Sequence, residues 1–336
     1  MLIRQFGIQN SPDGRTLLVH TPAKLNLFLD VLGKRADGFH ELITLMAKVS
    51  LFDTLSFTED SSGTIQLQCC NAGSGSGAED SLDTAIPSGQ DNLVVRAARL
   101  LQDYSGTKRG ARIGLLKRIP AAAGLAGGSS DAAATLKALN QLWQVGLDDR
   151  ELHSLASQLG SDINFFLGPT PLAVCRGRGE IIEPISLPVS MHFTIVWPDV
   201  GLSTADVFRQ LNNASLVSND AGEESRQNSR NTSRPCTDNS SVSRFVERMI
   251  EDLQRGDFGQ FSASLHNSLQ PPAEQLSKEV RYLKSVFDNL PVLGHMMSGS
   301  GSAYFGICRH RQQAQNMAAR LRARRLGRVF AVSTQS

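Results

Sequence analysis

The sequence predicts an α+β protein of two domains. Its 336 residues suggest two domains, since most domains hold roughly 100 to 200 residues. Hydrophobic residues make up 40% and charged residues 20%, which is typical of a folded globular chain rather than a disordered or fibrous one. Segments with strand-like alternation of apolar and polar residues occur together with segments of helical periodicity.

Strand patterns come first along the chain. Apolar and polar residues alternate over 17–32, so one face of this predicted strand is apolar and the other carries Lys24 and Asn26. A further strand is expected over 41–57. The stretch 58–90 is rich in Ser, Gly and acidic residues, which predicts a long hairpin with a mobile tip.

Helices and strands are both expected in the rest of the chain. Helical patterns occupy 93–101, with Asn92 as the N-cap, and 136–143, 148–159, 243–254, 272–287 and 311–324. Strands are expected at 111–116, 172–175, 193–197 and 303–308. The polar run 212–243 has too few apolar residues to bury, and it predicts a disordered insertion.

Charge and composition disfavour several classes of partner. Lys and Arg number 34 against 32 Asp and Glu, so no basic field exists to gather nucleic acid or an anionic membrane. No apolar run approaches the roughly 18 residues of a membrane span, and the first residues lack the order of a signal peptide. We therefore expect a cytoplasmic protein without nucleic-acid or membrane partners. A monomer or homodimer is the expected assembly.

The cysteines give no sign of a metal site or a disulfide framework. There are five of them, and none forms a C-x-x-C pair. We expect free thiols.

The segment 120–130, PAAAGLAGGSS, carries the most information about function. A glycine- and serine-rich loop leads there into an alanine-rich helix, which gathers backbone N–H groups, hydroxyls and the positive end of a helix dipole. This arrangement suits a phosphate group. It is neither a Walker loop nor a G-x-G-x-x-G motif, so by itself it also fits a plain turn before a helix.

Two further places carry reactive side chains. Lys24 and Asn26 lie two residues apart on a predicted strand, so they share a face at a spacing of roughly 6.6 Å. Asp162 precedes two aromatic residues. Each also has an ordinary interpretation, a solvated strand face for the first pair and a helix cap for Asp162.

Taken in order, five blocks resemble the GHMP family of small-molecule kinases. They are 22–27 (PAKLNL), 34–40 (KRADGFH), 120–130, 160–162 (GSD) and 298–302 (SGSGS). The resemblance covers most of the chain from about 17 to 307 except the two polar insertions. It implies an N-terminal ATP-binding domain of the ribosomal protein S5 domain 2 type over 1–185. A ferredoxin-like C-terminal GHMP kinase domain would follow over 186–336, with a cleft between the two.

The resemblance also implies roles for single residues. Asp162 is expected to be the general base and Lys24 its cationic partner, and a lysine beside a carboxylate would keep it ionised. Ser129 or Ser130 is expected to hold Mg²⁺ beside the ATP phosphates. The expected ATP-binding residues are Asn92, Lys117, Pro120, Ala121, Ala122, Ala123, Gly124, Leu125, Ala126, Gly127, Gly128, Ser129 and Ser130.

The substrate is indicated by Phe39 and His40, which match a Tyr-His pair of the family. The ring is expected to stack on cytosine while the histidine hydrogen-bonds it, and Phe208 closes the other side of the base. For the two phenylalanines the alternative is ordinary core packing. The implied reaction is ATP-dependent phosphorylation of the 2-hydroxyl of 4-diphosphocytidyl-2-C-methyl-D-erythritol, in the non-mevalonate isoprenoid route. The expected substrate-binding residues are Asn26, Phe39, His40, Thr204, Phe208, Gly299 and Ser300.

Two alternatives remain open at this point. One is another GHMP kinase, acting on a small alcohol such as mevalonate or homoserine, for which an aromatic-histidine pair would have no base to bind. The other is an inactive nucleotide-binding relative, against which the presence of both Lys24 and Asp162 argues.

The sequence also departs from the family pattern. Ala126 replaces a common glycine of the phosphate loop, which is tolerable at negative φ and otherwise a strain. Asn164 stands where proline is frequent, and the insertion 212–243 falls in the half that binds substrate.

Overall fold

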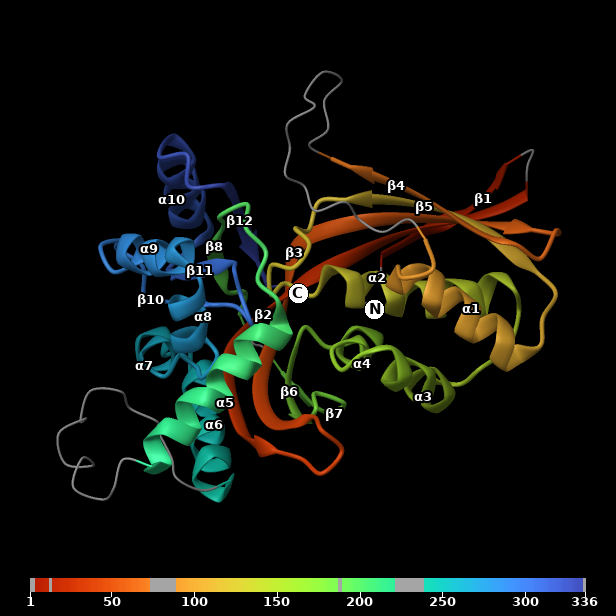
Figure 1. The fold of residues 1–336 in the computed structure, drawn as a ribbon. Helices are drawn as coiled ribbons and strands as arrows, with labels where there is room; N and C mark the ends of the chain where they lie inside the picture. The colour runs from red at the N-terminus through yellow and green to blue at the C-terminus, as the bar shows by residue number, and fades with distance from the viewer. Residues whose placement is uncertain (1–3, 12–13, 73–88, 187–188, 221–238, 335–336) are drawn as a thin grey trace.

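The computed structural model describes residues 4–11, 14–72, 89–186, 189–220 and 239–334 (Figure 1). Its larger sheet is built on two strands of 21 residues, β2 (Gly14–Lys34) and β3 (His40–Asp60), which pair antiparallel. The main strand order is β1-β2-β3-β5-β4, with β6 on β3, β7 on β6 and β9 on β2. The other members are β1 (Arg4–Ser11), β4 (Ile65–Asn71), β5 (Gly110–Lys117), β6 (Leu172–Gly177), β7 (Ile181–Ile185) and β9 (His266–Asn267).

The expected hairpin over 58–90 is wrong in its pairing. After β3 the chain turns into β4, which pairs in parallel with β5, so that β5 lies between β3 and β4. Contacts between residues far apart in the sequence favour this pairing, because Ile65, Leu67 and Cys69 of β4 pack against the core beneath the sheet. Residues 73–88, the expected mobile tip, lie outside the described residues.

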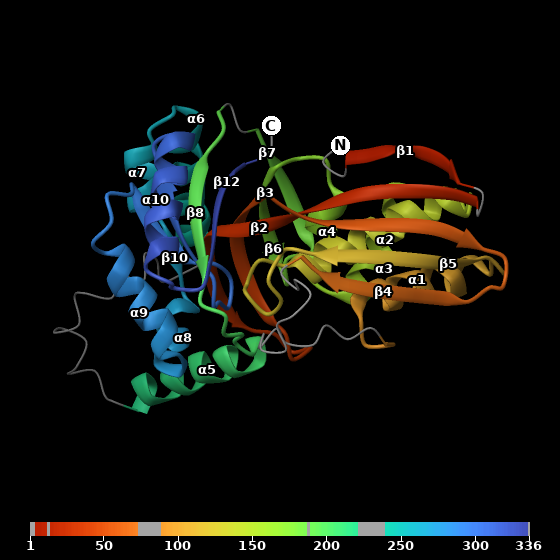
Figure 2. The ribbon, with the colours of Figure 1, turned by 90° about the horizontal axis from the view of Figure 1, so that it is seen from above.

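Four helices cover one face of this sheet, as both ribbon views show (Figures 1 and 2). The Asn92 cap is confirmed, since its Oδ1 accepts a hydrogen bond from the Val94 N–H at 2.9 Å. The second helix buries a run of alanines against the core, where small side chains let the backbones approach closely. The helices are α1 (Leu93–Ser105), α2 (Gly127–Leu142), α3 (Asp149–Leu159) and α4 (Ile163–Leu167).

The second half of the chain has a four-stranded antiparallel sheet of order β10-β11-β8-β12. Its strands follow a β-α-β-β-α-β succession, so the expected ferredoxin-like arrangement is confirmed. The strands are β8 (His192–Trp197), β10 (Gly294–Met297), β11 (Tyr304–Cys308) and β12 (Arg328–Ser333). The helices are α5 (Thr204–Asp220), α6 (Asn239–Gln254), α7 (Phe258–Ala263), α8 (Gln270–Leu276), α9 (Lys278–Phe287) and α10 (Arg311–Ala323).

Two expectations for this half need correction. The predicted disorder over 212–243 is wrong at both ends, since α5 runs to Asp220 and α6 begins at Asn239, while 221–238 lie outside the described residues. Buried Val207 in α5 and buried Val242 in α6 anchor the helices that run into this segment. The expected helix over 272–287 is two helices, because Ser277 ends α8 and caps α9.

Lys48 of β3 is a buried amine that does not line the cavity described below. Its Nζ donates a hydrogen bond to the Gly168 carbonyl oxygen at 2.7 Å and lies 4.9 Å from the Phe165 ring centroid. Burial, and then the charge of Lys137, lower the pKa of Lys48 from its ordinary 10.5 to about 7. Between those two values the unfolded chain binds more protons than the folded one, so stability rises with pH there.

We expect Lys48→Met to remove this pH dependence. The wild-type free energy of unfolding should gain up to about 1.4 kcal/mol per pH unit from this group between pH 7 and 9, and the variant should lack that gain. Urea unfolding at several pH values measures both slopes. Lys108→Met, at an exposed lysine, should keep the wild-type slope, and an equal slope in Lys48→Met would contradict the shift.

Candidate active site

A cavity of about 960 Å³ lies between the two halves and is lined by β2, β3, the 120–130 loop, the start of α5 and the turn after β10. Every predicted site residue lines it except Leu125 and Ser130. Both of these residues belong to the loop and are buried. The Leu125 carbonyl oxygen accepts a hydrogen bond from the Lys24 N–H at 3.0 Å, which ties the loop to β2.

Lys24 and Asn26 share a face of β2, as expected, but this face is buried rather than solvated. Lys24 is 4% exposed, and its Nζ donates a hydrogen bond to Asn26 Oδ1. The Asn26 amide in turn donates to Thr44 Oγ1 at 2.8 Å. This chain of bonds fixes the ammonium group, whose Nζ lies 3.4 Å from Asp162 Oδ2.

Asp162 stands at the start of α4, yet its side chain makes no capping bond there. The helix-cap interpretation is therefore wrong for this residue. Its carboxylate lies beside the Lys24 ammonium and also lines the cavity. A carboxylate at this place can accept a proton from a bound hydroxyl, as a general base does.

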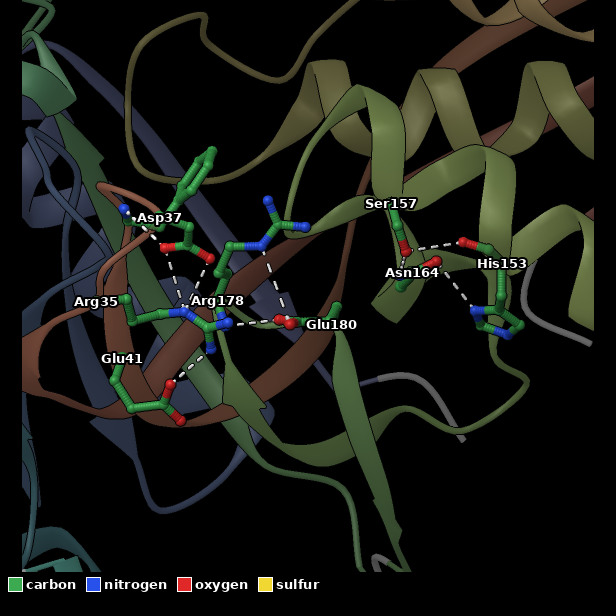
Figure 3. A network of polar contacts seen from close by, with 9 residues as sticks. Arg35, Asp37, Glu41, His153, Ser157, Asn164, Arg178 and Glu180 are labelled. Carbon is green, nitrogen blue, oxygen red and sulfur yellow. Dashed lines mark hydrogen bonds and ion pairs between the residues drawn. The ribbon is translucent and has the colours of Figure 1, made fainter.

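Asn164, where the family often has proline, holds the segment that follows Asp162. Its Nδ2 donates to Ser157 Oγ at 2.7 Å, and its Oδ1 lies 3.0 Å from His153 Nδ1 (Figure 3). Asn164 is 2% exposed. These bonds join α4 to α3 and fix the backbone from which Asp162 projects.

The 120–130 loop is held by contacts from both halves of the chain. Ser298 Oγ donates to the Gly124 carbonyl oxygen at 3.1 Å, and the Ala303 N–H donates to the Ala123 carbonyl oxygen at 3.0 Å. Gly124 has φ +74°, and a Cβ there would overlap the Ser298 carbonyl oxygen. The start of α2 is thereby aimed into the cavity, where its N–H groups suit an anion.

Ala126 adopts the left-handed conformation, with φ 53°. Alanine could replace glycine here without strain only at negative φ, so Ala126 is strained. A left-handed alanine costs roughly 1 to 2 kcal/mol, and here that strain lies at the N-cap of α2.

A buried ion cluster lies beneath the loop. The Lys117 ammonium donates hydrogen bonds to Asp53 and, at 2.9 Å, to Asp131 Oδ2, and Thr21 Oγ1 donates to Asp131 Oδ1 at 2.7 Å. Burial, and then the charge of Asp131, raise the pKa of Asp53 to about 6. Although burial opposes it, the two carboxylates raise the pKa of Lys117, so the lysine stays charged below Gly127.

The other end of the cavity carries Phe39, which is 51% exposed, so core packing is wrong for this residue. Its N–H donates to Asp37 Oδ1 at 3.1 Å, and Arg35 bridges Asp37 and Glu41 (Figure 3). The guanidinium of Arg178 lies 4.5 Å from the Phe39 ring centroid. This turn therefore presents an aromatic face and a cation side by side.

His40 and Phe208 both line the cavity, and their rings stack on each other. Their ring centroids are 4.6 Å apart at an interplanar angle of 29°, and His40 Nε2 lies 3.2 Å from Asn212 Oδ1. Thr204 Oγ1 and Ser300 Oγ are 2.8 Å apart nearby. The predicted substrate residues are thus gathered at one place.

Sequence reasoning missed several side chains of this site. Arg178 and Asp131 line the cavity, and Asn267 holds the Gly299 carbonyl oxygen at 2.8 Å. Asp131 directly follows the serines of the loop, so its position was a usable signal. Arg178 and Asn267 stand in no motif.

The remaining expectations concern metals, thiols and membranes. The cysteines at 69, 70, 175 and 308 are free thiols, as expected, and Cys236 lies outside the described residues. No cluster of three or more His, Cys, Asp or Glu suited to a metal occurs in the described ranges. Across those same ranges, no helix combines the length and apolar content that crossing a membrane requires.

Comparison with known proteins adds sequence evidence. The GHMP kinases N-terminal domain family matches residues 92–168, and the GHMP kinases C-terminal family matches 249–325. The 4-diphosphocytidyl-2-C-methyl-D-erythritol kinase of Shouchella clausii is 38% identical over 290 residues, which cover 86% of this chain and 84% of that protein. The chain belongs to the GHMP kinase family. Its class as an ATP-dependent small-molecule kinase is thereby confirmed.

Solved structures resemble this GHMP kinase over nearly its whole length. A crystal structure of 4-(cytidine 5′-diphospho)-2C-methyl-D-erythritol kinase has a TM-score of 0.71 at 35% identity, covering 95% of this chain and 100% of that one. The L. major mevalonate kinase in complex with R-mevalonate has a TM-score of 0.66 at 14% identity, covering 99% and 98%. At that identity the second likeness shows the fold alone.

Proposed function

We propose that this GHMP kinase transfers the γ-phosphoryl group of ATP to the 2-hydroxyl of 4-diphosphocytidyl-2-C-methyl-D-erythritol, in the non-mevalonate route to isoprenoids. The observation that carries the proposal is the Lys24–Asp162 pair, 3.4 Å apart, in one cavity with the phosphate loop and with Phe39 and His40. The relatives that bear this substrate in their names support it.

The reaction follows from the charges around that pair. The Asp162 carboxylate takes the proton of the hydroxyl, whose oxygen forms a bond to the γ-phosphorus as the bond to the ADP oxygen breaks. The Lys24 ammonium stabilises the negative charge on the transferring group. The N–H groups at the start of α2 bind the phosphates, while Lys117 supports the loop from below.

Mg²⁺ fits the phosphate end of the cavity. Ser129 lines it, and Ser130 Oγ, which is buried next to the lining, has no hydrogen-bond partner among the described residues. A serine hydroxyl, phosphate oxygens and water form a ligand set that Mg²⁺ prefers, and no protein carboxylate cage is needed. When bound, the ion neutralises charge on the phosphates.

The proposal also includes the domain bounds, the location and the assembly of the protein. We place the ATP-binding domain at 1–185 and the C-terminal domain at 186–336, with the boundary between β7 and β8. A cytoplasmic location suits the use of ATP with a diphosphate substrate, and we retain a monomer or homodimer without nucleic-acid partners as the expectation.

A coupled assay of ADP release tests the proposal. We expect turnover with the cytidine substrate and little with mevalonate or homoserine. Turnover of either small alcohol without turnover of the cytidine substrate would assign the protein to another branch of the family. No ADP release with any of the three alcohols, from folded protein, would favour the inactive relative.

We expect Phe39→Ala to raise the KM for the cytidine substrate and to leave the KM for ATP unchanged. Stacking of a base on an aromatic ring is worth roughly 1 to 3 kcal/mol in nucleic-acid platforms, which corresponds to about 5- to 150-fold in KM. Steady-state kinetics with each substrate varied in turn measures the effect. Tyr282→Ala removes a ring that is 58% exposed away from the cavity and should change neither constant. A wild-type KM in Phe39→Ala would remove the base from this end of the site.

A further inference from the structure

We infer that Asn212 is a positioning residue, which fixes the tautomer of His40 and so selects an amino-substituted pyrimidine. The inference rests on the proposed function, because it takes the base of the substrate to meet His40. Asn212 itself does not line the cavity, so its effect would pass through the imidazole.

His40 is held by two residues one turn apart on α5. The Phe208 ring stacks on the imidazole, and the Asn212 side chain meets its edge. Residues four apart lie on the same side of a helix, so α5 holds both the face and the edge of the ring. His40 begins β3 in the first half of the chain, whereas α5 belongs to the second half (Figure 1).

The contact with Asn212 decides which ring nitrogen carries the hydrogen. Asn212 Oδ1 lies 3.2 Å from His40 Nε2. An amide oxygen only accepts, so Nε2 carries the hydrogen and Nδ1 keeps its lone pair. Nδ1 makes no hydrogen bond within the described part of the chain, and His40 lines the cavity.

A lone pair at Nδ1 distinguishes cytosine from uracil. Cytosine presents an amino donor at the position where uracil presents a carbonyl acceptor. The amino group pairs with the lone pair, whereas the carbonyl would face it without a hydrogen. The Phe208 ring, at 29° to the imidazole, holds the plane in which such a base would bond to His40.

Three variants test the inference. Asn212→Leu keeps most of the volume and removes the acceptor. Asn212→Asp keeps the acceptor and removes the donor, and it is assayed at pH 9, well above the ordinary pKa of a free imidazole. Asn213→Leu is the matched control, at the exposed neighbouring position of α5. For each, kcat and KM are measured with the cytidine substrate, its uridine analogue and ATP.

We expect Asn212→Leu to reduce the preference for cytidine over uridine by about 2- to 12-fold, the ratio that corresponds to one neutral hydrogen bond. The change should fall on the KM of the cytidine substrate, with the KM for ATP and the melting temperature close to wild type. Asn212→Asp and Asn213→Leu should keep the wild-type preference. An unchanged preference in Asn212→Leu, or an equal loss in Asn212→Asp, would overturn the inference.

A spectroscopic measurement separates this inference from the proposed function. The ¹⁵N shifts of the unliganded protein, with the His40 signals identified by their loss in His40→Ala, report the tautomer without any substrate. We expect the Nε2–H form in the wild type and a mixture in Asn212→Leu. An Nδ1–H form in the wild type overturns the role of Asn212. A wild-type enzyme of the Nε2–H form that shows no preference for cytidine instead overturns the assigned substrate, and with it the selection step.

Discussion

Asp162→Asn is expected to lower kcat by on the order of 10² or more, while the affinity for ATP stays close to wild type. The asparagine keeps the shape of the side chain but cannot accept the hydroxyl proton as a base. Lys24 would also lose its anionic neighbour, 3.4 Å away. The loss should therefore appear in turnover rather than in nucleotide binding.

Single-turnover kinetics and ATP titration separate these two effects. Asp103→Asn, at an exposed position of α1, is the matched control and should leave turnover unchanged. Near wild-type turnover in Asp162→Asn would remove this carboxylate from the mechanism. A large loss of ATP affinity would instead make it part of the nucleotide site.

Lys24→Met is expected to give a folded protein whose turnover falls by about 10² to 10³, the range found when one preorganised donor to a transition state is removed. Methionine keeps much of the stem that β2 buries and removes the charge. The Asn26 amide would lose its donor, and Asp162 would remain as an unpaired carboxylate that is 33% exposed on its side chain.

The readout for Lys24→Met is kcat together with the melting temperature, which checks that the variant is folded. Lys108→Met, an exposed lysine beyond α1, controls for the loss of one positive charge. If Lys24→Met turns over at the wild-type rate, the lysine serves only to fill the face of β2.

Local signals predicted those parts of the molecule that local chemistry determines. Asn92 caps α1 because its side-chain oxygen accepts a hydrogen bond from the N–H of Val94, a contact that depends only on neighbouring residues. The 120–130 loop could be recognised for a similar reason, since its glycines and serines are contiguous. The spacing of Lys24 and Asn26 was enough to place them on one face.

Features that depend on distant partners were beyond such signals. The parallel pairing of β4 with β5 is set by the core beneath both strands rather than by the turn at Gly63. Asp53 and Lys117 form an ion pair although they are 64 positions apart in the sequence. Arg178 lies in the turn between β6 and β7, yet its guanidinium packs on the Phe39 ring. The sequence did not predict the helix at 212–220, because the polar composition of the whole segment indicated disorder. These residues continue α5, which begins at Thr204.

The length of β2 links the two halves mechanically. Its Leu17 and Val19 belong to the core under α1–α4, Leu25 and Leu27 to the core shared with the second sheet, and Leu29 to the core near α8 and α9. One continuous strand is thus part of three cores, and neither half can swing open without bending it. We therefore expect substrates to enter by movement of side chains and loops while β2 keeps its place. Calorimetry should show one cooperative heat-unfolding transition for the whole chain, whereas two separated transitions would mean that the halves unfold independently.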